Sequence, residues 1–224
     1  MSFRRLPVLP DVYPELGTFA MQGRTLIWLW RHDHKSVSID LSRPDASWEP
    51  LRAEPVPFVR RAAIVAEVPS GELLVWGGAE KKYVHGRAEV FKGDGALLAP
   101  DGAVRPVGAR KKPSARASAA WAMTGSELVV WGGTNGKKPL GNGAAYRFAS
   151  DDWRPISDEG APAPRYGAEC VWNGRELFVW GGANFEGASL RGDFLADGAA
   201  YDPAEDRWRS EEHTSELQSL TTIS

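Results

Sequence analysis

The sequence predicts an all-β protein in which a unit of four short antiparallel strands repeats about four times. The main observation is an apolar run that ends in Trp-Gly-Gly and occurs three times, with intervals of 55 and 49 residues between the tryptophans. A self-similar period of this length is typical of repeat architectures. The 24 glycines and 16 prolines indicate many short strands joined by turns, and no long segment shows the apolar stripe of a helix. The three runs are residues 73–78 (LLVWGG), 128–133 (LVVWGG) and 177–182 (LFVWGG).

Other residues repeat in register with these runs. An arginine stands fifteen residues before each tryptophan, at Arg61, Arg116 and Arg165. After two of the three Gly pairs comes Gly-Ala-Ala-Tyr, at residues 143–146 and 198–201, and seven residues past each tyrosine stands another tryptophan, Trp153 or Trp208. This constant spacing indicates that each copy folds as the same supersecondary unit.

The last copy predicts where the strands lie. We expect them at about residues 167–172, 175–180, 199–202 and 207–208, with Asn173-Gly174 as a tight turn. The runs 73–76 and 128–131 are apolar on both faces, which predicts strands packed between two neighbouring sheets. In each Gly pair the backbone is expected to leave the strand with positive φ, because glycine has no Cβ to oppose it.

The first two copies are irregular. In the first copy, residues 26–30 (LIWLW) stand where the Gly pair is expected, and residues 36–41 and Trp48 supply the later strands. The second copy lacks the Tyr and the final Trp, and we expect Phe91 to replace the Tyr.

The Gly pair, the spaced Tyr and the spaced Trp resemble the repeat of the Kelch family of β-propellers, whose period is about 50 residues. The resemblance covers roughly residues 17–208 and implies an incomplete Kelch-type β-propeller of about four blades, since Kelch propellers usually contain more. The blades are expected at residues 12–52 (degenerate), 60–108, 115–157 and 164–208. An interrupted array leaves the faces of its terminal blades uncovered, because each blade buries its apolar surface on a neighbour.

The C-terminal residues 209–224 are expected to be foreign to the fold. Residues 209–219 (RSEEHTSELQS) are what a DNA sequence similar to a common sequencing adapter encodes, and a natural polar tail is the alternative. We therefore leave this tail out of the functional argument.

Composition excludes several classes of protein. The 27 Lys and Arg nearly balance the 29 Asp and Glu, and residues 1–208 alone carry 26 of each, which argues against a general nucleic-acid binder. No apolar run approaches the roughly 18 residues of a membrane span. Residues 1–14 lack the apolar stretch of a secretory signal, which predicts a cytoplasmic protein, or an exported one if an upstream start was missed. The single Cys170 excludes an internal disulfide framework.

The predicted loops separate charge between two rims. Turns between strands one and two, and three and four, form a first rim, where we assign nine acids and one Arg to residues 69–72, 93–95, 124–127, 149–152, 173–176 and 202–206. The other loops form a second rim, where residues 79–88, 104–116 and 134–143 hold ten Lys and Arg and one acid, Glu80. Asp158, Glu159 and Glu186 in the last copy depart from this pattern.

This second rim is the predicted partner site. Basic loops attract anionic ligands and speed their association, so the hypothesis is an acidic protein segment or another anionic partner. A solvated charge pattern without a partner is the alternative. The candidate residues are Lys81, Lys82, Tyr83, His85, Arg110, Lys111, Lys112, Lys137 and Lys138.

Two interpretations are open for Arg61, Arg116 and Arg165. They could line the mouth of a central channel and clamp carboxylates with paired hydrogen bonds. The alternative is a framework role, with each guanidinium bonded to loop carbonyls, which their repeat spacing favours.

No motif names a reaction, a metal or a cofactor. The resemblance includes copper radical oxidases, but the Tyr and His ligands such a site needs are not identifiable, and Cys170 lies in an apolar strand typical of a core thiol. His32 and His34 could share a face, yet two ligands make an incomplete metal site. We therefore expect a non-catalytic interaction module without a cofactor. A carbohydrate-binding or sugar-isomerising propeller, similar to sialic-acid epimerases, is the alternative; a cluster of Glu, Arg, His or Tyr at the channel mouth would favour it.

Overall fold

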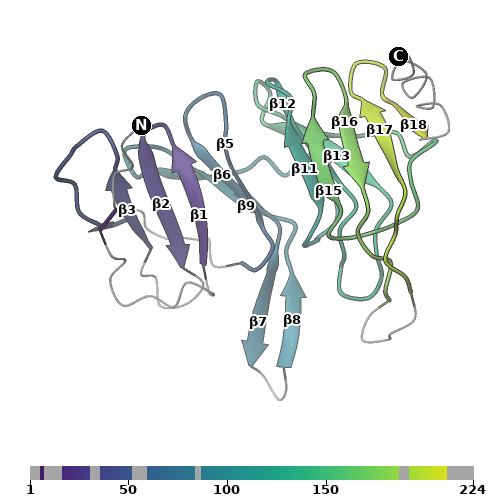
Figure 1. Cartoon of the computed structure of the whole chain (residues 1–224), viewed down its shortest axis with the longest axis horizontal. Helices are drawn as coiled ribbons and strands as arrows, with labels where there is room; N and C mark the ends of the chain where they lie inside the picture. Colours follow the sequence, from purple (N-terminus) through teal and green to yellow (C-terminus); the bar gives the residue numbers. More distant parts are fainter. Residues whose placement is uncertain are drawn as a thin grey trace, which may run out of the picture.

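The computed structural model describes residues 6–7, 17–30, 36–51, 60–83, 87–186 and 192–210. These residues form four antiparallel sheets of four strands each and one two-stranded hairpin, and none of them is helical. Figure 1 shows the four sheets following one another across the molecule in chain order. Nothing in the described part of the chain is a helix of the length and apolar character required to cross a membrane.

The strands have the following bounds. The first sheet contains β1 (Gly17–Gln22), β2 (Thr25–Trp30), β3 (Val37–Asp40) and β4 (Glu49–Pro50). The second contains β5 (Ile64–Glu67), β6 (Leu73–Trp76), β9 (Gly95–Leu98) and β10 (Val104–Pro106), and the hairpin β7 (Ala79–Tyr83) and β8 (Arg87–Phe91) lies between β6 and β9 in the chain. The third contains β11 (Ala120–Met123), β12 (Glu127–Trp131), β13 (Gly143–Arg147) and β14 (Asp152–Pro155). The fourth contains β15 (Glu169–Trp172), β16 (Leu177–Trp180), β17 (Gly198–Asp202) and β18 (Arg207–Ser210).

The repeat seen in the sequence is a repeat of strand register. In the third sheet Leu128 lies opposite Tyr146, which lies opposite Trp153. In the fourth sheet Leu177, Tyr201 and Trp208 form the same row. The four-strand meander predicted from the Tyr and Trp spacing is therefore confirmed in these two sheets.

The sheets stack face to face, and three apolar clusters join the first to the second, the second to the third and the third to the fourth. Because a central strand has a sheet on each side, β6 is buried along its whole length, as the apolar run of the sequence predicted. The first strands of neighbouring sheets also lie together, β1 beside β5 and β11 beside β15. Each sheet thus obtains most of its core from its neighbours rather than from its own strands.

A pair of tryptophans lies at the centre of two of these interfaces. The ring of Trp76 in the second sheet lies 5.0 Å from that of Trp153 in the third, and Trp131 lies 5.2 Å from Trp208 in the fourth. The N–H groups of Trp76 and Trp131 are buried without a hydrogen-bond partner, whereas Trp153 donates to the carbonyl of Gly108 at 3.1 Å. Trp76 and Trp131 are therefore held by aromatic contact and apolar burial rather than by hydrogen bonds of their indole groups.

The second sheet departs from the prediction. The β7–β8 hairpin is inserted between its second and third strands and projects away from the stack (Figure 1). Phe91 lies in this hairpin opposite Ala79, so the expectation that it replaces the repeat Tyr was wrong. Leu98 occupies that position instead, paired with Leu73 on one side and Val104 on the other. An inserted hairpin cannot be recognised from the spacing of the repeat alone.

The first sheet keeps the register despite its irregular sequence. Leu26 lies opposite Ile39, at the position of the repeat Tyr, and Trp48 immediately precedes Glu49, which pairs with Ser38. Trp48 donates through Nε1 to the carbonyl of Pro7 at 3.1 Å, much as Trp208 donates to Ser157 at 2.8 Å. Trp48 therefore stands in the place of the outer-strand tryptophan of the later sheets.

The Gly pairs take the positive φ angles expected of them, 69° and 90° in the third sheet. This turn lets the second glycine donate to the next sheet: the N–H of Gly78 bonds the carbonyl of Arg116, and that of Gly133 bonds the carbonyl of Arg165, both at 2.8 Å. A Cβ on Gly132 would lie 2.8 Å from the carbonyl oxygen of Arg165 in the next sheet. The pair is glycine because the backbones of two sheets meet there.

The expected foreign tail begins inside a strand. Arg209 and Ser210 extend β18 and pair with Ala200 and Ala199. The remainder of the tail, residues 211–224, lies outside the described residues.

Replacing Trp131 by Ala is expected to lower the free energy of unfolding by about 3–5 kcal/mol, because the change leaves a cavity between the third and fourth sheets. The same change at Trp180, which is 49 % exposed at the equivalent position, is expected to cost less than about 1 kcal/mol. Urea unfolding followed by circular dichroism measures both. Equal losses for the two variants would contradict the assignment of Trp131 to an inter-sheet core.

Candidate functional site

Two of the three repeat arginines are buried framework residues. Arg116 and Arg165 are 1 % and 0 % exposed. Arg116 donates through Nη1 to the carbonyls of Gly132 at 2.9 Å and Asn142 at 2.8 Å. Arg165 makes the same bonds to Gly181 at 3.0 Å and Asp197 at 2.9 Å. These are the contacts expected of a framework role, and they leave neither guanidinium free to clamp an external carboxylate.

The partner of each arginine belongs to a repeated Asp/Asn-Gly pair that sequence reasoning missed. Asp94, Asn142 and Asp197 each precede the glycine that begins the third strand. Their side chains accept a hydrogen bond from Nη2 of the arginine, at 2.9, 3.1 and 3.0 Å respectively. In the last two copies the glycine of this pair stands three residues before the repeat Tyr. This fixed spacing could have identified the pair from the sequence.

The framework arginine of the second sheet is Arg60, not Arg61. Arg60 is buried and donates through Nη1 to the carbonyls of Gly77 at 3.3 Å and Asp94 at 2.8 Å. The difference comes from the hairpin turn: residues 68–72 separate the paired Glu67 and Leu73, whereas only residues 124–127 separate Met123 and Leu128. One extra turn residue shifts the arginine by one position, so a constant sequence spacing identified the wrong residue.

Charge compensation differs among the three arginines. Asn142 carries no charge, and burial lowers the pKa of Arg116 to about 10, so it stays protonated near neutral pH. In the fourth sheet the hydrogen bond from Arg165 lowers the pKa of Asp197. In the second sheet burial alone would raise the pKa of Asp94, but the hydrogen bond and charge of Arg60 lower it. The carboxylates therefore stabilise the sheet ends in their ionised form.

Displaced from the framework, Arg61 reaches a cavity on the second rim. The residue after each framework arginine pairs with the residue after the Gly pair: Arg61 with Ala79, Ala117 with Thr134, and Tyr166 with Ala183. These residues converge on a cavity of about 290 Å³ between the second, third and fourth sheets. The cavity is lined by Arg61, Ala62, Glu89, Phe91, Ala117, Ser118, Thr134, Gly136, Tyr166 and Phe185.

Backbone hydrogen bonds between sheets form the framework beneath this cavity. Ser118 donates its N–H to the carbonyl of Ala62 at 3.2 Å, and Gly167 donates to the carbonyl of Ser118 at 2.8 Å. All three residues have positive φ, between 52° and 64°. Two of them, Ala62 and Ser118, carry a side chain in a conformation that L residues rarely adopt. The strained positions recur at the start of each first strand, where the sheets come closest.

The polar centre of the cavity is an ion pair. Nη2 of Arg61 lies 2.5 Å from Oε1 of Glu89, and the arginine side chain is half exposed. Around this pair the cavity has three aromatic residues, Phe91, Tyr166 and Phe185, and two hydroxyl side chains, Ser118 and Thr134. Arg61 is the one predicted site residue among these, and Phe91 had been expected only as the replacement of the repeat Tyr. The others lie on a hairpin and loops whose convergence depends on the stacking of three sheets.

The described residues among the predicted basic set lie on three elements: the loop after Thr134, the flank of the third sheet and strand β7. The exposed Lys137 and Lys138 lie in the loop after Thr134, held by Oδ1 of Asn135, which accepts a bond from each backbone N–H. Arg110 lies on the flank of the third sheet, where its carbonyl accepts a bond from the N–H of Trp153, with Lys111 and Lys112 following it in the chain. Lys81, Lys82 and Tyr83 belong to strand β7, and His85 lies outside the described residues.

The predicted charge separation between rims needs correction. Arg105 bonds Glu72 on the first rim at 2.8 Å, and Asp94 lies on the second rim with Arg60. The acids of the first rim are neutralised by neighbouring arginines: Glu127 by Arg154, Asp152 by Arg147, Asp202 by Arg175 and Glu176 by Arg209. The first rim is a set of ion pairs rather than a bare acidic surface.

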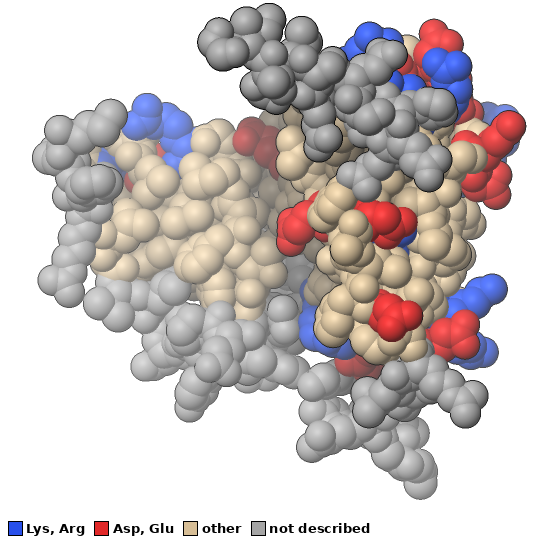
Figure 2. Space-filling model, turned by 45° about the vertical axis from the view of Figure 1, so that its right-hand side comes forward, with Lys and Arg blue, Asp and Glu red and all other residues tan. Residues whose placement is uncertain are grey.

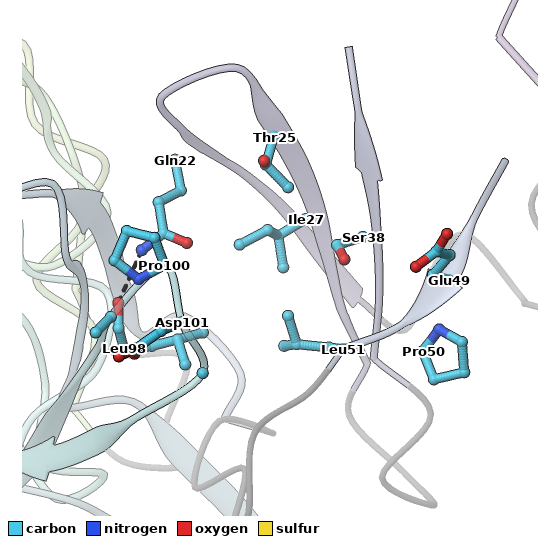
Figure 3. A pocket seen from close by; sticks show the side chains of 12 residues that line it. Gln22, Thr25, Ile27, Ser38, Glu49, Pro50, Leu51, Leu98, Pro100 and Asp101 are labelled. Atoms are coloured by element: carbon cyan, nitrogen blue, oxygen red, sulfur yellow. Dashed lines mark hydrogen bonds between the residues drawn. The ribbon is translucent and has the colours of Figure 1, made fainter. Parts of the chain in front are cut away.

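A second cavity, of about 330 Å³, lies between the first and second sheets. Figure 3 shows Gln22 at its edge, with Nε2 bonded to the carbonyl of Leu98 at 2.8 Å; the same atom also donates to Gly71. Ile27 and Leu51 point into the space, whereas Glu49 stands apart from them at the far side. The amide of Gln22 is committed to joining the two sheets. The described residues that line the cavity include the carboxylates of Glu49 and Asp101 but no basic side chain, so they offer no counter-charge to an anionic ligand.

The described residues contain no group of three His, Cys, Asp or Glu side chains that could hold a metal ion. His32 and His34 lie outside the described residues. Cys170 is half buried between the third and fourth sheets, where its thiol bonds the carbonyl of Trp121 at 2.8 Å, and burial raises its pKa. A protonated, hydrogen-bonded thiol in this position agrees with a core role.

No protein-family model matches the chain, and no curated protein matches it. The functional argument therefore depends on the cavity at Arg61. An exposed guanidinium beside a carboxylate, with aromatic faces around them, can bind a polar group from outside without any covalent step.

Replacing Arg60 by Met is expected to lower the free energy of unfolding by about 2–4 kcal/mol, because the carbonyl of Gly77 and the carboxylate of Asp94 lose their donor. The matched variant Arg61→Met removes an exposed ion pair and is expected to cost less than about 1 kcal/mol. Urea unfolding of the two variants checks this. A larger loss at Arg61 would show that the sequence spacing had identified the framework residue after all.

Acid sensitivity should depend on Asp197. Because Arg165 lowers its folded pKa below the unfolded value of about 3.9, this carboxylate stabilises the fold above that pH and stops doing so as the pH falls through its folded pKa. Asp197→Asn, which copies the natural Asn142, should reduce stability near pH 7 and have little effect near about pH 2. Unfolding curves across this range test it; a difference that stays constant with pH would contradict the assignment.

Proposed function

We propose that this chain is part of a Kelch-type β-propeller and acts as a non-catalytic binding module. Four antiparallel sheets stacked in chain order, with a Trp-Gly-Gly turn at the end of the central strand in three of them, support the family assignment. In this proposal the four sheets are blades, and the cavity at Arg61 lies near the mouth of the central channel.

The observation that carries the binding role is the position of Arg61. Arg116 and Arg165, which have the same sequence spacing to the Trp-Gly-Gly run, are buried and bonded to carbonyls. The extra turn residue leaves Arg61 half exposed in a cavity built from three blades. The volume of this cavity suits a single side chain of a partner or a small ligand. We infer that this cavity receives an anionic group of a protein partner, with Arg61 as its counter-charge.

Neighbouring loops add favourable charge around the cavity. Lys137 and Lys138 are exposed on the loop that also supplies Thr134 and Gly136 to the cavity wall. These lysines would attract an acidic segment over a distance and raise its rate of association, with Arg61 making the close contact.

A carbohydrate ligand is the second candidate, and the mixed chemistry of the cavity favours it. Sugar hydroxyls can accept bonds from Arg61 and donate bonds to Glu89 at the same time. The rings of Phe91, Tyr166 and Phe185 offer apolar faces to the C–H surface of a sugar. Glu89 would repel an anionic partner but would hold a neutral polyol, so the two ligands differ in their need for this residue.

Two variants separate the candidates. Binding of an oligo-glutamate peptide, measured by isothermal titration calorimetry, is expected to weaken about tenfold or more with Arg61→Ala and to strengthen with Glu89→Gln, because the second change removes a competing carboxylate. Binding of a neutral oligosaccharide found by array screening is expected to weaken with both. Arg207→Ala, an exposed arginine on the first rim, is the control and should change neither. If Arg61→Ala left the affinity for every ligand intact, the binding role of this cavity would be refuted.

A further inference from the structure

In the second and third sheets, the last strand carries an arginine that bonds a glutamate beside the second strand. Arg105 donates to Glu72 through Nε and Nη2, both at 2.8 Å. Arg154 donates to Glu127 through the same two nitrogens, at 2.9 and 2.8 Å. These paired hydrogen bonds close the sheets at the first rim. Figure 2 accordingly shows basic and acidic side chains close together at its upper right, over the turns of the later sheets.

In the first sheet the strand register puts Glu49 at the position of these arginines. Glu49 lies opposite Ser38, which lies opposite Ile27, and Thr25 stands two residues before Ile27. Counted in the same way, these are the positions of the arginine and of the glutamate in the second and third sheets. A carboxylate and a hydroxyl thus replace the ion pair, and Glu49 forms no ion pair with any residue that the structure describes.

The second sheet lacks the groups that receive such an arginine in a later interface. Arg154 reaches the hydroxyl of Tyr201 at 3.3 Å and lies 3.5 Å from Asp206, both in the fourth sheet. In the second sheet Leu98 takes the place of this Tyr. Gly102 takes the place of the Asp, because each stands two residues before the partner of the Leu or Tyr, and both have positive φ.

The four replacements meet at one cavity. Thr25, Glu49, Leu98 and Gly102 all line the cavity of about 330 Å³ between the first and second sheets. Each has a smaller side chain than its counterpart in the interface between the third and fourth sheets, where an arginine occupies the equivalent place. The cavity is therefore a site from which the chain's own cation has been removed.

The polar side chains of this cavity offer acceptors and no positive charge among the described residues. Glu49 and Asp101 carry carboxylates on opposite sides of the space (Figure 3). Oδ1 of Asp101 accepts a backbone N–H of its own turn at 2.9 Å, which leaves the other oxygen for a ligand. Gln22 commits Nε2 to two carbonyls, so its amide oxygen is left as an acceptor. A fitting ligand must donate hydrogen bonds and carry positive charge.

We propose that this cavity binds an alkylguanidinium group, carried by a small molecule or by an arginine side chain of a partner. A guanidinium has five N–H donors and no acceptor, and its planar fork bonds a carboxylate with two parallel bonds. Glu49 is its counter-charge, with Asp101 on the opposite side. Ile27 and Leu51 point into the space between them (Figure 3) and pack against the methylene groups of the ligand.

Titration of the full chain with butylguanidinium at low ionic strength tests this proposal, with NMR signals of the Ile27 and Leu51 methyl groups as the readout. Shifts that saturate at millimolar concentration are expected for a ligand of this size. Butylurea has a similar shape without the charge and should bind about tenfold more weakly or less. The proposal would be overturned by equal binding of the two compounds, or by methyl signals that butylguanidinium does not move.

Two variants locate the binding at Glu49. Glu49→Gln is expected to weaken binding of butylguanidinium about tenfold or more, whereas Glu159→Gln, which changes an exposed carboxylate of the second rim, should leave it unchanged. The double change Thr25→Glu with Glu49→Arg copies the ion pair of the third sheet. It is expected to abolish binding without lowering the urea midpoint, because the new arginine fills the site. Full affinity in Glu49→Gln, or binding that survives the double change, would refute the assignment.

A further compound distinguishes the two sources of the group. N-acetyl-arginine methylamide presents the guanidinium as a protein chain does. If it binds more tightly than butylguanidinium, the ligand is a side chain of a partner; if it binds more weakly, the cavity excludes a peptide backbone and takes a free small molecule. Arg61→Ala should leave both affinities unchanged, since the cavity at Arg61 lies between other sheets.

Discussion

A buried guanidinium closes the end of each of the last three sheets, and the arrangement of the second rim depends on it. The arginine donates hydrogen bonds to the carbonyl of the first glycine in the Gly pair and to the carbonyl of the residue before the third strand. The carbonyl before the third strand also accepts the N–H of that glycine, so the arginine gives it a second bond. The arginine is the donor to the glycine carbonyl, which would otherwise be a buried acceptor without a partner. The same arginines offer their own carbonyls to the preceding sheet, at Arg116 and Arg165. One residue type therefore stabilises a sheet and also links it to its neighbour.

This framework explains why the cavity at Arg61 forms where it does. Because the framework arginine is held in the interior, the next residue in the chain is always placed at the inner end of the first strand. That residue is Arg61, Ala117 or Tyr166, so a constant scaffold presents a variable set of side chains to one space. The residue that stabilises the sheet and the residue that reaches the cavity are therefore neighbours in the chain, so the side chains at the cavity differ between sheets while the framework is kept.

The stacking of the sheets creates the core of the described residues and leaves one side of the fourth sheet exposed. The indole N–H groups of Trp76 and Trp131 are buried without partners, a cost that the surrounding apolar contact offsets. Among the described residues no sheet covers the outer side of the fourth sheet, and Trp180 is exposed there. Trp131, at the same position of the third sheet, is buried, so the exposure of this tryptophan follows from its place in the array and not from residue type.

The sequence by itself determined the four-strand unit, its approximate period and the positions of its glycines and tryptophans. These features follow from local chemistry, because alternation, turn residues and positive φ are properties of short segments. Only the tertiary structure decided that Arg60 rather than Arg61 is buried, that Leu98 replaces the repeat Tyr, and that Glu89, Tyr166 and Phe185 share a cavity. One added turn residue and one inserted hairpin change which side chains meet while leaving the local pattern intact, and contacts between residues far apart in sequence cannot be deduced from spacing within a repeat.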